Sequence, residues 1–197
     1  THDLTYALAF NKKLADDYNI GDIYSLVKDG KWTFDQMLAM MKTATTDANG
    51  DTKMDENDNY GYCAHPKNVL PSFWIAAGEM SVKKDENDRP YLAMGEERFT
   101  NVFNKVYDIT YGAGTYYKPT NGDMNDVTDA QRKLFTDNQL LFMDCSFFYA
   151  QLLRSMETDF GIIPYPKYNE DQDRYYSRVS YYNAPVIPIS NDRSELV

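Results

Sequence analysis

The chain has 197 residues, enough to bury a core and form one domain, and its hydrophobic content of 43% is that of a globular protein. A net charge of −10 without a basic cluster argues against a nucleic-acid partner and an anionic membrane surface, and it favours a soluble monomer. Most of the 15% aromatic content is tyrosine, whose apolar ring and polar tip suit wet interfaces and sugar-like ligands.

The first third of the chain predicts a strand, three helical segments and a second strand. Residues 4–10 alternate as a strand does, and Asn11 is placed to cap the helix that follows. A short helical turn is predicted at 22–27. Residues 33–36 (TFDQ) form a capping box ahead of an apolar helical stripe. Residues 60–64 then predict a short strand.

The middle of the chain predicts two helices joined by polar segments. Pro71 is placed as the first residue of a helix that Gly78 ends. Residues 83–90 read as a polar hairpin or loop, and the apolar positions over 99–110 repeat at helical spacing. The loop over 111–126, which holds Tyr116 and Tyr117, is long enough for a binding or lid role.

The last third predicts strands that alternate with helices. A capping box at 128–131 is expected to open a helix, followed by a strand at 139–143, a helix at 149–156 and a strand at 160–163. Strands are also expected at 177–181 and 186–189, where Pro185 and Pro188 favour an edge or a crossing segment. The alternation predicts an α/β fold with a mainly parallel sheet flanked by helices.

A binding site is predicted just after residue 143. Ligands of open α/β sheets bind beyond the carboxyl ends of the strands, and Asp144, Ser146, Phe147 and Phe148 follow such a strand. Asp144 could instead serve only as a helix cap, and one of the two phenylalanines could belong to the core.

The cysteines and the chain ends carry less information. Cys63 and Cys145 are too few for a disulfide framework, so we expect two buried thiols, or one bridge if their strands are neighbours. The sequence contains no signal peptide or transmembrane run. The chain starts at Thr1 without an initiator Met, and we expect it to be a fragment of a longer protein.

Residues 47–58 (DANGDTKMDEND) have the spacing of a calcium-binding loop. Oxygen side chains fall at positions 1, 3, 5, 9 and 12, and a backbone carbonyl falls at position 7. The run resembles dockerin loops more than EF-hands, and we expect a structural Ca²⁺ with a Kd of roughly 10⁻⁴ to 10⁻³ M. The alternative is a solvated acidic loop. The predicted ligands are Asp47, Asn49, Asp51, Lys53, Asp55 and Asp58.

Several segments, taken in order, resemble the family 1 extracellular solute-binding proteins of ABC importers, which include maltose-binding-protein-like members. The most specific of them are 30–35 (GKWTFD) and 159–167 (DFGIIPYPK). The others are 10–14 (FNKKL), the acidic loop into 59–61 (NYG), and 140–143 (LLFM).

The resemblance implies a periplasmic-binding-protein-like type II fold of two α/β lobes. Residues 1–197 would form a single lobe, which corresponds to the second lobe of such a protein. The first lobe and the closing helices would be missing. It also implies capture of an extracellular solute, most often a sugar or oligosaccharide, and delivery to an ABC permease. The parent protein would be a membrane-anchored lipoprotein or periplasmic.

The same resemblance implies ligand contacts for six residues. Phe147 or Phe148 would stack on a sugar ring, and Phe73 or Trp74 would form a second aromatic site. Asp144 and Ser146 would bind ligand hydroxyls.

Two other functions are considered. A carbohydrate hydrolase needs two carboxylates held across a bond, and the sequence pairs none into such a site. His65 has no evident partner for a nucleophilic triad, so we expect no enzyme activity. The second alternative is a calcium-stiffened adhesion or scaffold module, which would have a protein partner and no solute cleft.

Overall fold

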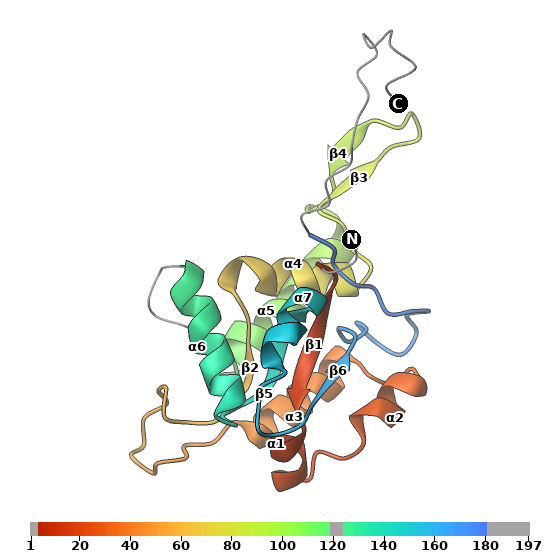
Figure 1. The fold of residues 1–197 in the computed structure, drawn as a ribbon. Coiled ribbons are helices and arrows are strands. Elements are labelled where there is room, and N and C mark those ends of the chain that lie inside the picture. The colour runs from red at the N-terminus through yellow and green to blue at the C-terminus, as the bar shows by residue number, and fades with distance from the viewer. Residues whose placement is uncertain (1–3, 119–123, 181–197) are drawn as a thin grey trace, which may run out of the picture.

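The computed structural model describes residues 4–118 and 124–180, and these form a four-stranded sheet with helices on both faces (Figure 1). The strand order is β2 (Tyr60–Cys63), β5 (Leu140–Ser146), β1 (Tyr6–Asn11) and β6 (Phe160–Ile163). β2 runs parallel to β5, whereas β1 runs antiparallel to both of its neighbours. The α/β class is therefore confirmed.

The sheet is mixed, which corrects the prediction of a mainly parallel sheet. β5 and β6 are joined through a short helix and run in the same direction, but β1 lies between them and runs against both. Alternating strands and helices in the sequence indicate crossover connections. They do not reveal that the first strand of the chain is inserted between two later ones.

One face of the sheet carries the larger hydrophobic core. Side chains alternate between the faces of a strand, and Leu8, Phe10, Tyr62 and Phe142 all point to this side. Trp32 is buried against Phe142 here, with ring centroids 5.5 Å apart. The covering helices are α1 (Lys12–Asp17), α2 (Ile23–Lys28), α3 (Phe34–Ala44), α4 (Pro66–Ala76) and α5 (Glu97–Tyr107).

The opposite face carries a smaller core. Cys63, Met143 and Cys145 point to this side and pack against α6 (Met124–Thr136) and a 3₁₀ turn (Gln151–Leu153). Both cysteines are buried free thiols, although their strands are neighbours. Because both faces of the sheet are covered, every residue of β5 is buried.

The predicted helix caps at the start of the chain are confirmed. The Asn11 side chain accepts the backbone N–H of Leu14 at 3.0 Å, and the Thr33 hydroxyl accepts that of Gln36 at 3.4 Å. Each cap satisfies an N–H that the first turn of a helix leaves without a partner. The predicted strands at the start of the chain, at 60–64 and at 160–163 are also present.

Two helices begin earlier than predicted. α4 starts at Pro66 rather than at Pro71, because the His65 side chain caps it by accepting the Lys67 N–H at 3.2 Å. Pro71 lies inside the helix. α6 begins at Met124, so the predicted capping box at 128–131 lies within the helix.

The region after residue 143 also differs from the prediction. β5 continues to Ser146, because β1 pairs with it as far as Tyr6 opposite Ser146. The helix expected over 149–156 is α7 (Phe147–Ala150), followed by the 3₁₀ turn. Ser146 is its cap and accepts the backbone N–H of Tyr149 at 3.1 Å, so Asp144 is not a helix cap.

The predicted hairpin is formed by β3 (Val82–Lys84) and β4 (Pro90–Leu92), and it extends away from the body (Figure 1). α5 continues into a π-helical turn (Asp108–Gly112). Part of the predicted 111–126 loop and the whole predicted 186–189 strand, with Pro185 and Pro188, lie outside the described residues. Within 177–180, Val179 forms a bridge with Thr5, so the two ends of the described chain lie side by side.

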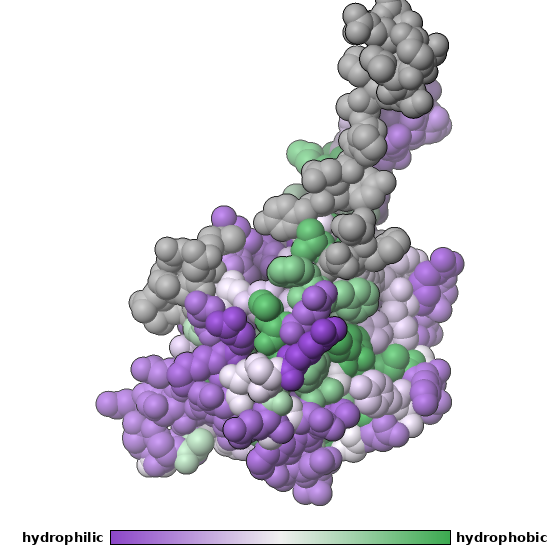
Figure 2. Space-filling model, viewed as in Figure 1, coloured by the Kyte–Doolittle hydropathy of each residue, from purple (hydrophilic) through white to green (hydrophobic). Residues whose placement is uncertain are grey.

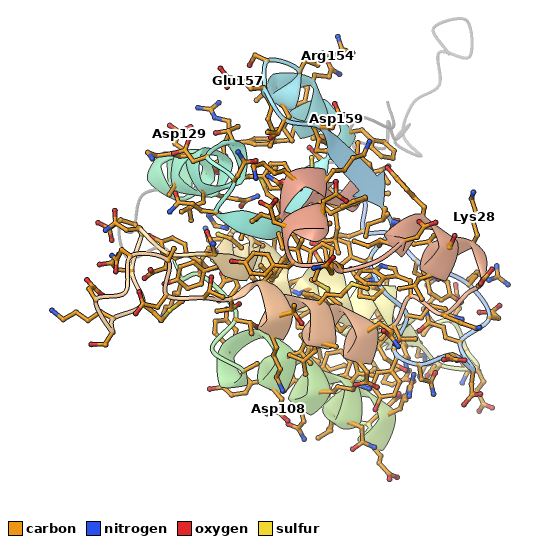
Figure 3. The ribbon with its side chains drawn as sticks, turned by 90° about the horizontal axis from the view of Figure 1, so that it is seen from below. Lys28, Asp108, Asp129, Arg154, Glu157 and Asp159 are labelled. Atoms are coloured by element: carbon orange, nitrogen blue, oxygen red, sulfur yellow. The ribbon has the colours of Figure 1, made fainter. Side chains whose placement is uncertain are left out.

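The surface is mostly polar, with an apolar area on the face that carries α7 and β6 (Figure 2). Charged side chains point outward around the body, as shown for Lys28, Asp108, Asp129 and Glu157 (Figure 3). None of the helices in the described part of the chain combines the length and the apolar character that a membrane-spanning segment requires.

Candidate functional site

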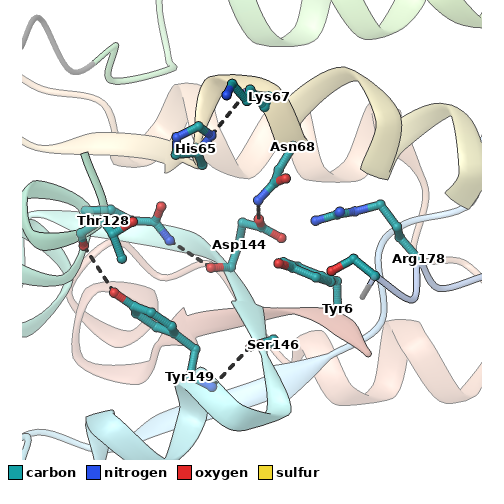
Figure 4. Close-up of a pocket in the computed structure, with 11 residues that line it drawn as sticks. Tyr6, His65, Lys67, Asn68, Thr128, Asp144, Ser146, Tyr149 and Arg178 are labelled. Carbon is teal, nitrogen blue, oxygen red and sulfur yellow. Dashed lines mark hydrogen bonds between the residues drawn. The ribbon is translucent and has the colours of Figure 1, made fainter. Parts of the chain in front are cut away.

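A pocket of about 330 Å³ lies at one end of the sheet (Figure 4). The parallel strands β2 and β5 end here, and the antiparallel β1 begins here. This is the end of an α/β sheet at which ligands bind. The lining side chains come from β1, α4, α6, β5, α7 and the last described segment: Tyr6, His65, Lys67, Asn68, Thr128, Gln131, Asp144, Ser146, Tyr149, Arg178 and Ser180.

Asp144 is the buried carboxylate of this pocket. One of its side-chain oxygens accepts from Asn68 Nδ2 at 3.2 Å, and the other accepts from the Tyr165 hydroxyl at 2.5 Å. The Tyr62 hydroxyl lies 3.2 Å from that of Tyr165 and extends the network into the core. Gln131 Nε2 donates to the backbone carbonyl of Asp144 at 2.7 Å. These bonds hold the carboxylate in one orientation.

The position of Asp144 in its strand explains this arrangement. It lies opposite Leu8 in the register and two residues after Phe142, so it points to the face that α4 covers. Burial raises the pKa of Asp144 to about 6. The Tyr165 hydroxyl, then Arg178, act in the opposite direction and limit the rise. The pKa of this carboxyl group is therefore closer to neutral pH than that of an ordinary aspartate.

Arg178 covers the other side of the pocket. Its guanidinium carbon lies 3.6 Å from the centroid of the Tyr6 ring, and its Nε donates to the Ser72 hydroxyl at 3.1 Å. The backbone is fixed as well, because the Tyr6 N–H donates to the Arg178 carbonyl at 2.9 Å. Arg178 Nη2 and the Ser180 hydroxyl are buried and have no hydrogen-bond partner among the described residues.

His65 and Ser146 line the same pocket but act as helix caps. His65 Nδ1 accepts from the Lys67 backbone, and burial, followed by the charge of Lys67, lowers the pKa of His65. Within residues 4–118 and 124–180, no hydrogen bond links His65 to Asp144 or to Ser146. The three side chains therefore do not form a nucleophilic triad.

The described residues of the pocket do not include the acid pair of a glycosidase. Asp144 is the sole carboxylate among the described residues that line it. Hydrolysis of a glycosidic bond by the usual route requires two. The arrangement can bind polar groups, because it offers a carboxylate, an amide, hydroxyls and two cations around one cavity.

Two of the six predicted ligand contacts, Asp144 and Ser146, line this pocket. Phe73 instead lies in the core with no exposed surface, edge-on to Phe34, Tyr62 and Tyr165 at 5.3 to 5.6 Å. Trp74 is half-buried against Phe99, with ring centroids 5.4 Å apart. The packing of α4 onto the sheet therefore turns Phe73 into the core.

Phe147 and Phe148 lie on α7 outside the pocket. They are 45% and 52% exposed, and Leu152 beside them is 45% exposed. The three are exposed apolar side chains of α7 and of the 3₁₀ turn that follows it. Tyr116, a weaker candidate, is buried and donates to the Ala64 carbonyl at 2.9 Å, and Tyr117 packs on Tyr60.

The sequence analysis missed several residues of the pocket. Tyr6, Asn68, Gln131 and Arg178 have no shared motif, and their spacing along the chain carries no signal. His65 could have been placed, since a polar residue before Pro66 and after a predicted strand is a helix-start signal.

The acidic loop lies at the opposite end of β2 from the pocket. The Asp47 carboxylate accepts from the backbone N–H groups of Gly50 and Thr52 at 2.7 and 2.8 Å. Asp58 accepts from Ala48 and Asp55 in the same manner, at 2.9 and 2.8 Å. In the described parts of the chain, no group of three or more His, Cys, Asp or Glu side chains is arranged to hold a metal ion. The calcium site stays a prediction from the sequence.

Solved structures of solute-binding proteins have the same fold as this chain. The maltose/maltodextrin-binding domain MalE from Bdellovibrio bacteriovorus, bound to maltotriose, is 17% identical with a TM-score of 0.60, over 92% of this chain and 44% of that one. A family 1 extracellular solute-binding protein from Bifidobacterium longum subsp. infantis is 16% identical with a TM-score of 0.55, over 91% and 45%.

The chain has the solute-binding-protein fold. An ABC substrate-binding protein from Listeria monocytogenes, in complex with cycloalternan, is also similar. It is 13% identical with a TM-score of 0.58, over 80% of this chain and 36% of that one. The predicted resemblance is thus confirmed for the fold, and the chain spans less than half the length of these structures. No protein-family model and no curated protein matches the sequence.

Proposed function

We propose that this chain binds a sugar or oligosaccharide as part of the solute-binding component of an ABC importer. The pocket at the carboxyl ends of β2 and β5 carries the proposal, because it combines buried hydrogen-bonding groups with an aromatic ring in a solute-binding-protein fold. Three similar structures were solved with maltotriose, cycloalternan and tagatose, respectively.

In this proposal each group of the pocket has a distinct task. Asp144 and Asn68 bind sugar hydroxyls, since a carboxylate oxygen retains acceptor capacity beyond one hydrogen bond. Tyr6 offers an aromatic edge beside them. The rest of the parent protein supplies the first lobe, which closes over the solute, and a permease receives it. The parent protein is proposed to be extracellular or periplasmic, with a lipid anchor as one form of attachment.

The test is a titration of the chain, and of the longer parent protein, with saccharides of one to four rings. Isothermal calorimetry and thermal shift are expected to detect binding of at least one saccharide. Asp144→Asn should weaken it by about tenfold or more, because a carboxylate makes the stronger hydrogen bonds. The exposed Asp173→Asn is the matched control and should leave binding unchanged.

Two results would overturn the proposal. One is the absence of saccharide binding to both the chain and the parent protein. The other is turnover of a glycoside, which would favour a hydrolase instead.

A further inference from the structure

The charges around the pocket are unlike those of the chain as a whole. The chain has a net charge of −10, yet Lys67 and Arg178 both line the pocket, and Asp144 is the single carboxylate among the described lining residues. Lys67 also lies in the first turn of α4, an 11-residue helix whose N-terminus carries positive partial charge. The pocket is therefore positive within an acidic molecule.

Arg178 lines this pocket and has a side-chain donor without a partner among the described residues. Its Nε is engaged by Ser72 and its plane lies over Tyr6, so the guanidinium is held in place. Nη2 is buried and has no partner among the described residues, and the Ser180 hydroxyl is in the same state. A buried donor without an acceptor destabilises the structure, because the donor has lost its hydrogen bonds to water. A ligand that supplies an acceptor removes this penalty.

The Asp144 carboxylate does not supply that acceptor. Its two oxygens accept from Asn68 (Figure 4) and from Tyr165, and the charge of Arg178 acts on it only through space. A guanidinium matches a carboxylate, sulfate or phosphate group better than a lone hydroxyl, because two of its N–H groups can donate in parallel.

We propose that the solute of this pocket is an acidic saccharide, whose carboxylate, sulfate or phosphate group is held by Arg178 with help from Ser180 and Lys67. The inference rests on the proposed saccharide-binding function and specifies the class of its solute. The anionic group lies on the Arg178 side, and neutral hydroxyls lie toward Asp144, because a second negative charge beside that carboxylate would be repelled.

The experiment compares saccharides of equal ring number by calorimetry: a neutral one, a uronate, a sulfated one and a phosphorylated one. At least one acidic saccharide should bind about tenfold or more tightly than the neutral one, and its affinity should fall with added salt. The three acidic arms distinguish the anionic groups. Free acetate, sulfate and phosphate serve as probes of the anion alone and should bind more weakly than the saccharide.

The variants test the role of Arg178. Arg178→Gln should lower the affinity for the acidic saccharide by roughly 10–100-fold and that for the neutral one by less than about threefold. Arg154→Gln, an exposed site away from the pocket, should change neither. Lys67→Gln is a second variant on a separate element, with an expected loss of about two- to tenfold for the acidic saccharide.

Three outcomes would overturn the inference. Equal or tighter binding of the neutral saccharide contradicts it while leaving the proposed function intact. An equal loss for both saccharides in Arg178→Gln, with Lys67→Gln neutral, assigns Arg178 to the support of the pocket wall. Failure of every saccharide to bind overturns the proposed function and this inference together.

Discussion

Two aspartates at opposite ends of the sheet, Asp144 in β5 and Asp58 just before β2, have surroundings that are opposite in kind. Asp144, at the pocket end, is bonded to side chains 21 and 76 residues away, and burial raises its pKa to about 6. Asp58, at the loop end, accepts backbone N–H groups 3 and 10 residues away, and the bond from Asp55 lowers its pKa. The pocket therefore depends on tertiary packing, whereas the loop is organised by its own backbone.

The largest difference in the free energy of unfolding is expected when one apolar side chain is truncated near the pocket and one in the acidic loop. Phe73→Ala removes a ring with no exposed surface and should lower the free energy of unfolding by about 3–5 kcal/mol. Met54→Ala, in the loop at 46% exposure, should change it by less than about 0.5 kcal/mol. Urea unfolding measures both, and similar losses at the two sites would contradict the comparison.

The pH dependence of stability should have opposite signs at the two ends. A raised pKa means that the folded state binds more protons than the unfolded state between pH 3.8 and about 6, so stability falls as pH rises through this window. Relative to Asp144→Asn, the wild type should lose up to about 3 kcal/mol across it.

At Asp58 the folded pKa lies below the unfolded value of 3.8, so its contribution is present above that value. It should be lost as pH falls below it. Asp58→Asn should therefore remove stability at neutral pH and little at very low pH. Denaturant unfolding over a pH series measures the difference in stability between the wild type and each variant. A slope of the same sign with pH at both sites would refute the prediction.

Removal of one tyrosine hydroxyl near each region should give a smaller difference in the free energy of unfolding. Tyr165→Phe deletes the donor to the Asp144 carboxylate and should lower the free energy of unfolding by about 2 kcal/mol. Tyr117→Phe, beside the loop, is the control, since the Tyr117 hydroxyl has no hydrogen bond among the described residues. A loss below about 0.5 kcal/mol for Tyr165→Phe would show that the bond contributes little.

Calcium is expected to have the smallest effect, and to act at the loop end alone. With a Kd of roughly 10⁻⁴ to 10⁻³ M, about 1 mM Ca²⁺ should stabilise the chain by about 0.4–1.4 kcal/mol. Asp47→Ala should abolish this gain, and Asp88→Ala, in an exposed hairpin turn, should preserve it. Calorimetry without a binding heat, together with a melting temperature that chelator does not change, would remove the predicted site.

The local elements follow from the sequence because their causes lie within a few residues along the chain. Asn11 and Thr33 bond to N–H groups three residues on, and the strand and helix periods are visible without any partner. The α/β class could be predicted for the same reason, and the resemblance to solute-binding proteins rests on segments such as 30–35 and 159–167. The mixed sheet could not, because the insertion of β1 between β5 and β6 leaves no local trace.

The pocket was decided by the tertiary structure. The sequence placed Asp144 and Ser146 at the end of a strand, where the pocket lies. It could not distinguish Phe73 from Phe147, because only packing buries the first and exposes the second. Arg178 reaches the site because the last described segment pairs with Thr5, far away in the chain. Burial and hydrogen bonding between distant segments set the chemistry of this pocket, and both exist only once the sheet and its helices have closed around it.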